Sequence, residues 1–310
     1  MVSTGISIRA ELVEPLFFLL AQGCKVKDGP STSSGRTDLS ESPISAPSAS
    51  APILLFDSGV GGLTVLAELR ALLPQAPVIY AADIAGLPYG SKTEAEVAAR
   101  VSGLLGRMAE RYQPRLICIA CNTASTIALG MVREVLETPI VGTVPAIKPA
   151  AAMTETGTIG LLGTEATVRQ RYVDDLENAF AKDKTLLRYG ANDLVALGEA
   201  KLRGDAVSVD AVANAAKGLV LQPGGENLDT VVLACTHFPL LEPELREAFG
   251  PKVRFVHGAA GIARRIASLL DGQDFARTVP DFAVTTGVAA DFDRLAPAFA
   301  RHGIERLVRF

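Results

Sequence analysis

Short apolar runs alternate with longer amphipathic stretches along most of this chain. The runs that predict β-strands are residues 52–57, 77–82, 115–121, 139–143, 157–162, 184–188, 229–234, 253–256, 281–286 and 305–309. Between them, apolar residues recur at helical spacing, for example in 94–112, 166–180 and 243–249. This alternation predicts an α/β fold with mainly parallel sheets covered by helices on both faces. Ten strands are many for one open sheet, so we expect two α/β domains.

The first part of the chain breaks this pattern. Residues 25–51 are rich in serine and proline, and such a segment cannot bury enough apolar surface to become ordered. We therefore expect residues 1–51 to form a disordered N-terminal extension, either native or the result of a start codon assigned too early. The apolar stretch 12–20 is too short to span a bilayer, and its acidic residues Glu11 and Glu14 count against a signal peptide.

Composition and charge narrow the function classes. The 310 residues are 48% hydrophobic, enough for a substantial core. The net charge is −4 with both signs well mixed, which gives no electrostatic footprint of nucleic-acid binding. Four cysteines are too few for a disulfide framework in a chain of this size, and free thiols at strand ends fit the reducing cytoplasm.

Two of the cysteines occupy matching places in the pattern. Cys121 follows the apolar run 116–120 and begins Cys-Asn-Thr-Ala-Ser, and Cys235 follows the run 230–234 and begins Cys-Thr-His-Phe-Pro. Ligands of parallel α/β folds bind at the carboxyl ends of strands. Both thiols are therefore candidates for an acid and a base that act on opposite faces of one carbon. His237 and the predicted helix N-terminus beside Cys235 provide a means of activating that thiol.

Three other strand ends carry polar motifs. The turn 57–62, Asp-Ser-Gly-Val-Gly-Gly, offers a carboxylate as a base partner and glycine N–H groups that can bind an anion. It has neither the Rossmann spacing nor the P-loop lysine. The segment 88–90, Pro-Tyr-Gly, is either an ordinary turn or a backbone site for a substrate carboxylate. Thr164 and Thr167 are either helix caps or ligands of a carboxylate.

Cys118 and Cys121 also form a Cys-x-x-Cys sequence, which keeps a metal- or redox-binding protein as an alternative of a different class. Residues three apart on a strand point to opposite faces, so Cys118 is more simply a core residue. A zinc site completed by Cys235 and His237 needs an unusual Cys-x-His half. We therefore expect no metal ligands among these residues.

Five segments, taken in order, resemble glutamate racemases: residues 57–65 (DSGVGGLTV), 88–90 (PYG), 121–125 (CNTAS), 163–167 (GTEAT) and 234–241 (ACTHFPLL). The resemblance runs from about Ile53 to the C-terminus. It implies two pseudo-symmetric α/β domains, residues 52–144 with 256–310 and residues 145–255, with the active site in the cleft between them. It also implies cofactor-independent racemisation of L-glutamate to D-glutamate for peptidoglycan synthesis, in the cytoplasm. We expect a homodimer that binds neither nucleic acid nor membrane.

The resemblance also assigns roles to residues. The catalytic set that it implies is Cys121, Cys235, Asp57, His237 and Glu199. The substrate-binding positions that it implies are Asp57, Ser58, Tyr89, Gly90, Asn122, Thr123, Thr167, Thr236 and His237. It favours Cys121 as the thiol that acts on D-glutamate and Cys235 as the thiol that acts on L-glutamate.

The chain departs from the family pattern in two places. Residues 190–192 are Gly-Ala-Asn where the family commonly has Ala-Cys-Pro, and this weakens the assignment of Glu199. His257 stands where an aspartate is typical, and we expect no catalytic task for it.

The nearest rival function is that of an aspartate racemase or a related two-thiol enzyme of the same superfamily. His237 favours glutamate, because aspartate racemases typically carry Glu at that position. An inactive family member retained for binding is a further alternative.

Overall fold

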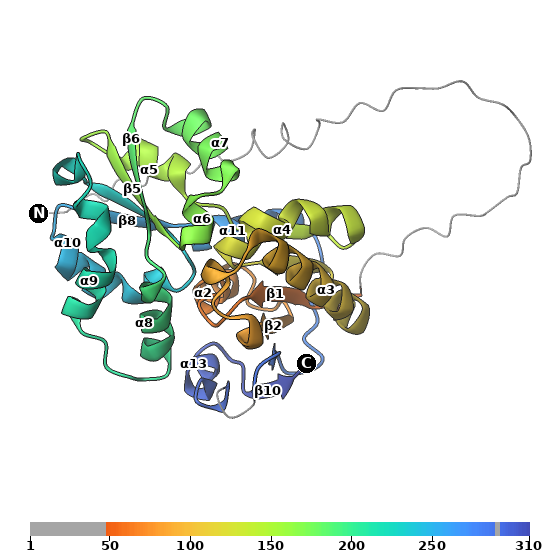
Figure 1. Cartoon of the computed structure of the whole chain (residues 1–310). Coiled ribbons are helices and arrows are strands. Elements are labelled where there is room, and N and C mark those ends of the chain that lie inside the picture. Colours follow the sequence, from red (N-terminus) through yellow and green to blue (C-terminus); the bar gives the residue numbers. More distant parts are fainter. Residues whose placement is uncertain (1–47, 289–291) are drawn as a thin grey trace, which may run out of the picture. The chain divides into compact units, whose positions relative to one another are not determined.

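The computed structural model describes residues 48–288 and 292–310, and it contains all ten predicted strands (Figure 1). These strands are β1 (Ile53–Asp57), β2 (Val78–Ala82), β3 (Leu116–Ile119), β4 (Ile140–Gly142), β5 (Thr158–Gly163), β6 (Thr185–Gly190), β7 (Thr230–Ala234), β8 (Arg254–His257), β9 (Phe282–Thr285) and β10 (Arg306–Arg309). Their ends differ from the predicted ones by a few residues at most, so the predicted strands are confirmed.

Helices connect most of these strands. They are α2 (Leu63–Leu72), α3 (Glu94–Tyr112), α4 (Asn122–Val135), α5 (Ile147–Met153), α6 (Glu165–Val168), α7 (Arg171–Phe180), α8 (Asp193–Leu202), α9 (Val209–Val220), α10 (Glu242–Phe249), α11 (Ala259–Leu269) and α13 (Ala296–Ala300). Helix α3 has the predicted bounds, and Thr93 begins it with a full capping box.

The prediction of one helix over 166–180 was wrong, because the chain forms α6 and α7 there. Gln170 between them has an extended backbone. Its side-chain amide donates to the carbonyl oxygen of Ala166 and to Glu94 Oε1 at the start of α3. These bonds hold Gln170 out of a continuous helix.

The strands form two sheets with the same internal order. One sheet runs β10-β9-β2-β1-β3-β4 and the other runs β6-β5-β7-β8, and every pairing is parallel. The order β2-β1-β3-β4 therefore recurs as β6-β5-β7-β8. Two sheets built on one repeated order confirm the α/β fold with two pseudo-symmetric halves. The strands divide in the same way as the proposed domains, although β8 extends past the proposed boundary to His257.

Each sheet has an apolar core on both faces, because successive strand residues point to opposite sides. In β1, Ile53 and Leu55 pack with α2 and α11, whereas Leu54 and Phe56 pack with α3 and α4. The second sheet packs one face against α8, α9 and α10 and the other face against α5 and α7. Burial of each large aliphatic side chain contributes about 1.5–3 kcal/mol, so the four clusters fix both sheets.

Residues 48–51 belong to the folded part, although they were assigned to the N-terminal extension. The guanidinium of Arg115 donates to the carbonyl oxygens of Ser48, Ala49 and Ala51. Residues 1–47 of the predicted extension, including the apolar stretch 12–20, lie outside the described residues.

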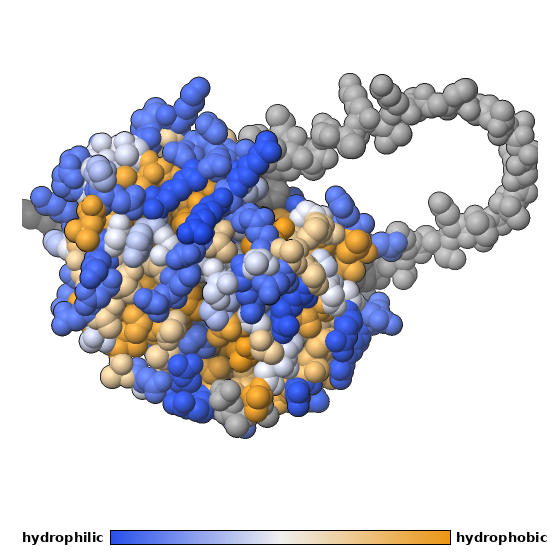
Figure 2. Space-filling view, in the orientation of Figure 1, coloured by the Kyte–Doolittle hydropathy of each residue, from blue (hydrophilic) through white to orange (hydrophobic). Residues whose placement is uncertain are grey.

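The surface of the described part is mixed in polarity. Figure 2 shows hydrophobic and hydrophilic residues interspersed over the face in view. Among the described residues, no helix is both long enough and apolar enough to cross a bilayer.

Asp229, just before β7, holds the loop that leads into β5. Its carboxylate accepts hydrogen bonds from the hydroxyl of Thr154 at 2.7 Å and from the backbone N–H groups of Glu155 and Thr156 at 2.7 and 2.9 Å. Burial opposes ionisation of this group, but these hydrogen bonds outweigh burial and lower its pKa to about 2.

We predict that Asp229→Asn lowers the free energy of unfolding at pH 7 by about 2 kcal/mol. A depressed pKa gives stability that is full above the unfolded-state pKa near 3.8 and is lost as the pH falls towards the folded-state pKa of about 2. The difference in the free energy of unfolding between the unaltered protein and Asp229→Asn should therefore shrink to about half at pH 3. Urea unfolding at pH 7 and pH 3 measures it. The control is Asp271→Asn, which removes the same charge from an exposed position. Equal losses for the two variants would contradict the prediction.

Candidate active site

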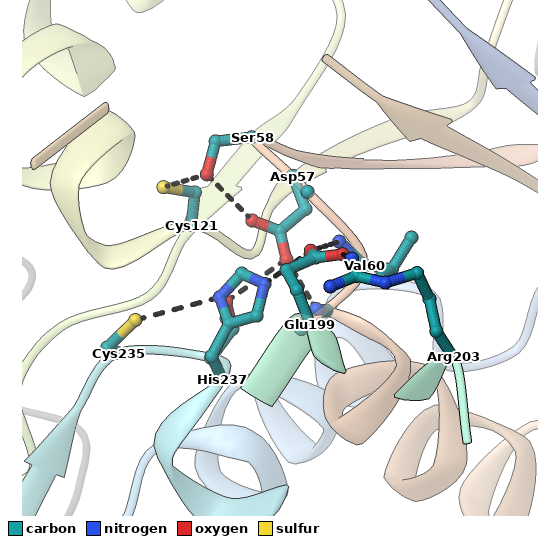
Figure 3. Close-up of polar contacts among 12 residues, drawn as sticks. Asp57, Ser58, Val60, Cys121, Glu199, Arg203, Cys235 and His237 are labelled. Atoms are coloured by element: carbon teal, nitrogen blue, oxygen red, sulfur yellow. Dashed lines mark hydrogen bonds and ion pairs between the residues drawn. The ribbon is translucent and has the colours of Figure 1, made fainter. Parts of the chain in front are cut away.

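The polar strand ends meet where the strand order of each sheet reverses. In the first sheet, β1 lies between β2 and β3, so the chain leaves the ends of β1 and β3 in opposite directions and opens a crevice there. Ser58 follows β1 at this crevice and Cys121 follows β3. Cys235 follows β7, which is the counterpart of β3 in the second sheet. Figure 3 shows both thiols facing the same group of polar side chains.

A cavity joins the two thiols, and we call it the substrate cavity. It is lined by Ser58, Leu87, Pro88, Tyr89, Gly90, Cys121, Asn122, Thr123, Thr164, Val195, Cys235, Thr236 and His237. Most of the predicted binding residues are in this lining. Asp57, Thr167 and Glu199 are buried outside it and act on its lining residues.

Cys121 lies in a surrounding that keeps its thiol protonated. Burial, and next the negative charge of Asp57, raise the pKa of this thiol to about 12. The hydroxyl of Ser58 lies 3.4 Å from its sulfur, and that hydroxyl is also 3.5 Å from Asp57 Oδ1. The backbone N–H of Ala124 donates to the sulfur at 3.4 Å, in the position of an N-cap of α4. Cys121 is therefore suited to donate a proton.

Cys235 has a cationic neighbour instead. The Nδ1 atom of His237 lies 3.8 Å from its sulfur, and the Nε2 atom of His237 lies 2.7 Å from Glu199 Oε1. Burial lowers the pKa of His237, but the bonds to Cys235 and Glu199 outweigh burial and raise it well above its ordinary value. The same partnership lowers the pKa of Glu199 against the effect of burial. An imidazolium stabilised by a carboxylate places a positive charge beside the sulfur of Cys235.

Glu199 also connects the two halves of the site. Its Oε1 atom accepts a hydrogen bond from the backbone N–H of Val60 at 3.1 Å, and Arg203 lies 3.7 Å from its Oε2 atom. Val60 belongs to the turn after β1, whereas Glu199 lies on α8 after β6. The position assigned with the least support from the sequence is therefore one of those that join the two halves.

Asp57 is held behind the site, with no exposed surface. Its Oδ2 atom accepts hydrogen bonds from the backbone N–H of Gly62 and from the hydroxyl of Thr236 at 3.1 Å. Burial raises the pKa of Asp57 despite the opposing charge of His237 and these two bonds. The side chain thus orients Thr236 and contacts Ser58, which in turn contacts Cys121.

The expectation that the glycines of the 57–62 turn offer their N–H groups to an anionic ligand was wrong for Gly62. The N–H of Val60 binds Glu199 and the N–H of Gly62 binds Asp57, so carboxylates of the chain itself occupy them. Glycine is required in this turn for another reason, which is close contact with the other half of the site. A Cβ atom on Gly61 would lie 2.7 Å from the backbone nitrogen of His237, so the turn contacts the other half too closely for a side chain.

Three threonine hydroxyls meet across the two halves of the site. Thr123, Thr164 and Thr167 lie 3.0 to 3.1 Å from one another. Thr164 lines the substrate cavity, whereas Thr167 is fully buried behind it. Thr164 also caps α6. The structure confirms its role as a helix cap, and its role as a ligand of a carboxylate stays a prediction.

Asp83 was missed by the analysis of the sequence. It is fully buried and accepts hydrogen bonds from the hydroxyl of Tyr89 at 2.5 Å, from the guanidinium of Arg100 and from the hydroxyl of Thr286. The hydroxyl of Tyr89 is therefore directed to Asp83 and fixes the 88–90 turn. The signal was present, because Asp83 follows β2 just as Ser58 follows β1.

Cys118 is not paired with Cys121. Cys118 packs in the apolar cluster with α2 and α11, and Cys121 packs on the opposite face of the sheet with α4. This confirms the prediction that Cys118 is a core residue. Within residues 48–288 and 292–310, no three or more His, Cys, Asp or Glu side chains are grouped so that they could hold a metal ion.

Comparisons with known proteins agree with this architecture. Residues 64–266 match the model of the family described as Asp/Glu/hydantoin racemase. The chain belongs to that family of racemases.

Within the family, the chain groups with glutamate racemases. It is 64% identical over 241 residues to the glutamate racemase of Sphingopyxis alaskensis, covering 77% of this chain and 90% of that one. It is 43% identical over 257 residues to that of Salmonella typhimurium, covering 82% and 90%. The crystal structure of Escherichia coli glutamate racemase with L-glutamate and the activator UDP-MurNAc-Ala has 42% identity and a TM-score of 0.78, covering 84% of this chain and 98% of that one.

We predict that Glu199→Gln lowers the pKa of His237 by about 1 to 3 pH units, because it removes the negative charge that favours the imidazolium. In the unaltered protein the ring stays protonated as the pH rises through neutrality, and in the variant it loses its proton earlier. NMR titration of the ¹⁵N-labelled ring measures this. The control is Glu247→Gln on the exposed side of α10, which should leave the titration unchanged. An unaltered His237 titration in Glu199→Gln would refute the charge partnership.

Proposed function

We propose that this chain interconverts L- and D-glutamate by a two-base mechanism that needs no cofactor. The observation that carries the proposal is that two thiols from matching strand ends line one cavity. Two proton carriers on opposite sides of a bound carbon can remove a proton from one face and add one to the other.

In the direction from L- to D-glutamate, Cys235 acts as the base. Its thiolate, next to the His237 imidazolium, takes the α-proton and becomes a thiol. The electron pair left on the α-carbon then takes the proton of the Cys121 thiol on the opposite face, and Cys121 becomes a thiolate. The reverse direction uses the same groups with their roles exchanged. The raised pKa of Cys121 and the charged neighbour of Cys235 support this assignment.

The carbanion-like intermediate needs stabilisation, because the α-proton of an amino acid is very weakly acidic. Hydroxyl and amide groups of Ser58, Asn122, Thr123 and Thr236 line the cavity and are the candidates to bind the substrate carboxylates and amino group. In the structure, the hydroxyls of Thr123, Thr164 and Thr167 form hydrogen bonds with one another. Thr123 and Thr164 can redirect these bonds to a bound substrate.

Glutamate is the proposed substrate and aspartate the rival. The chain carries His237 after Cys235-Thr236, and the related racemases compared above are glutamate racemases. One of them binds L-glutamate. We further propose that the reaction supplies D-glutamate for peptidoglycan synthesis and that the enzyme is a homodimer. We also propose that it acts in the reducing cytoplasm, where its thiols stay free.

We predict that the protein in D₂O exchanges the α-hydrogen of L- and D-glutamate for deuterium and racemises both. L- and D-aspartate should remain unchanged. Proton NMR of the α-hydrogen signals measures exchange, and circular dichroism measures the change of configuration. Metal-free protein is used throughout, so that a metal-dependent reaction is not mistaken for this one. Exchange of aspartate alone, or of neither amino acid, would overturn the proposal.

We also predict that Cys121→Ala and Cys235→Ala each reduce the rate of racemisation by at least about 100-fold, because each removes one of the two proton carriers. Cys118→Ala is the matched control. It removes a thiol that lies in the core and does not line the substrate cavity, so racemisation should persist. If either active-site variant retained near-full turnover, a two-thiol mechanism would be excluded.

A further inference from the structure

Cys235 borders a second cavity in addition to the substrate cavity. We call it the α11 cavity, because it lies at the start of that helix. Its lining includes Thr64, Asn122, Thr143, Cys235, His257 and Gly258. Cys121 lines the substrate cavity but not the α11 cavity. The two thiols, so similar in their place on the strands, therefore differ in what lies beside them.

Two polar side chains in the α11 cavity have no hydrogen-bond partner among residues 48–288 and 292–310. The Asn122 amide and the Thr143 hydroxyl make no hydrogen bond within the described residues, although Asn122 is only 8% exposed and Thr143 only 4%. Among the described residues, the polar side-chain atoms that are both shielded from water and without a partner are Ser125 Oγ and Thr230 Oγ1, so the polar atoms of Asn122 and Thr143 keep some accessible surface. Buried polar groups require hydrogen bonds, and a polar cavity provides them through water.

The lining of this cavity also reaches the surface. Thr64, His257 and Gly258 are partly exposed, whereas Cys235 and Thr143 are buried. The cavity therefore extends from partly exposed residues at the start of α11 to Cys235. Asn122, Cys235 and Thr236 line both cavities, whereas Thr64, Thr143, His257 and Gly258 line the α11 cavity and not the substrate cavity.

We propose that the α11 cavity is a water path through which the thiol of Cys235 exchanges its proton with solvent while substrate fills the other cavity. The inference rests on the proposed racemisation. The α-proton that Cys235 takes becomes its S–H hydrogen, and a water molecule in the α11 cavity replaces it with a solvent proton. The hydrogen that Cys121 takes stays on its sulfur until substrate leaves.

This asymmetry has an isotopic consequence. When L-[2-²H]glutamate reacts in H₂O, Cys235 takes the deuterium and exchanges it for a solvent proton. If Cys235 then gives a proton back to the same face of the carbon, the L-glutamate that re-forms carries hydrogen instead of deuterium. When D-[2-²H]glutamate reacts, Cys121 takes the deuterium and returns the same atom. Deuterium should therefore be lost from the starting enantiomer more readily with L- than with D-glutamate.

The experiment measures, at low conversion, the loss of deuterium from the remaining starting enantiomer and the formation of the other enantiomer. Chiral chromatography with mass spectrometry gives both rates. We expect the ratio of deuterium loss to racemisation to be severalfold larger for L-glutamate. Equal ratios for the two enantiomers would overturn the water path and leave racemisation itself intact. A protein that racemises neither enantiomer would overturn the proposed function and this inference with it.

A double variant tests the cavity directly. Thr143→Val removes the hydroxyl, and Gly258→Ala adds a Cβ atom that would lie 3.0 Å from the position of Thr143 Oγ1. Together they should lower the ratio of deuterium loss to racemisation for L-glutamate to the value found for D-glutamate. The rate of racemisation should stay unchanged. The matched control is Gly261→Ala in the same helix, where a Cβ atom meets nothing within 4 Å. A double variant that keeps the high ratio of the unaltered protein would refute the route.

Discussion

The arrangement of the site depends on the buried contact between Glu199 and His237. Their atoms are 2.7 Å apart, and the same carboxylate oxygen accepts the N–H of Val60 from the turn after β1. Removing one partner of a buried ion pair typically costs about 3–5 kcal/mol, because the remaining charge is left without compensation. One carboxylate thus fixes the charge of the imidazole beside Cys235 and joins the two halves between which the substrate cavity lies.

Repetition of the fold and divergence of its side chains together produce the chemistry. The repeated order β2-β1-β3-β4 and β6-β5-β7-β8 brings a thiol to the same strand end in each half. The neighbours of these thiols differ. Cys121 lies beside Ser58 and near Asp57, whose negative charge favours the protonated thiol. Cys235 instead lies beside the positively charged ring of His237. A symmetric pair would not be poised in either direction before substrate binds.

Much of this could be predicted from the sequence. The strands, α3 and the core position of Cys118 followed from hydrophobic periodicity, which is local along the chain. The break at Gln170 did not follow, because its cause is a hydrogen bond to Glu94 on a distant segment. The place of Asp83 after a strand could be predicted from the sequence, but its partners Tyr89, Arg100 and Thr286 converge only in the folded chain.

The sequence by itself determined which residues stand at strand ends, because that depends on the local pattern. It therefore also determined that Cys121 and Cys235 occupy equivalent positions on their strands. The tertiary structure decided what those thiols contact. The N–H of Gly62, expected to be free for a ligand, is bonded to Asp57, and the N–H of Val60 in the same turn is bonded to Glu199. A second cavity borders Cys235 and not Cys121. Contacts between residues far apart in the chain depend on how the two sheets pack, and local periodicity carries no information about that packing.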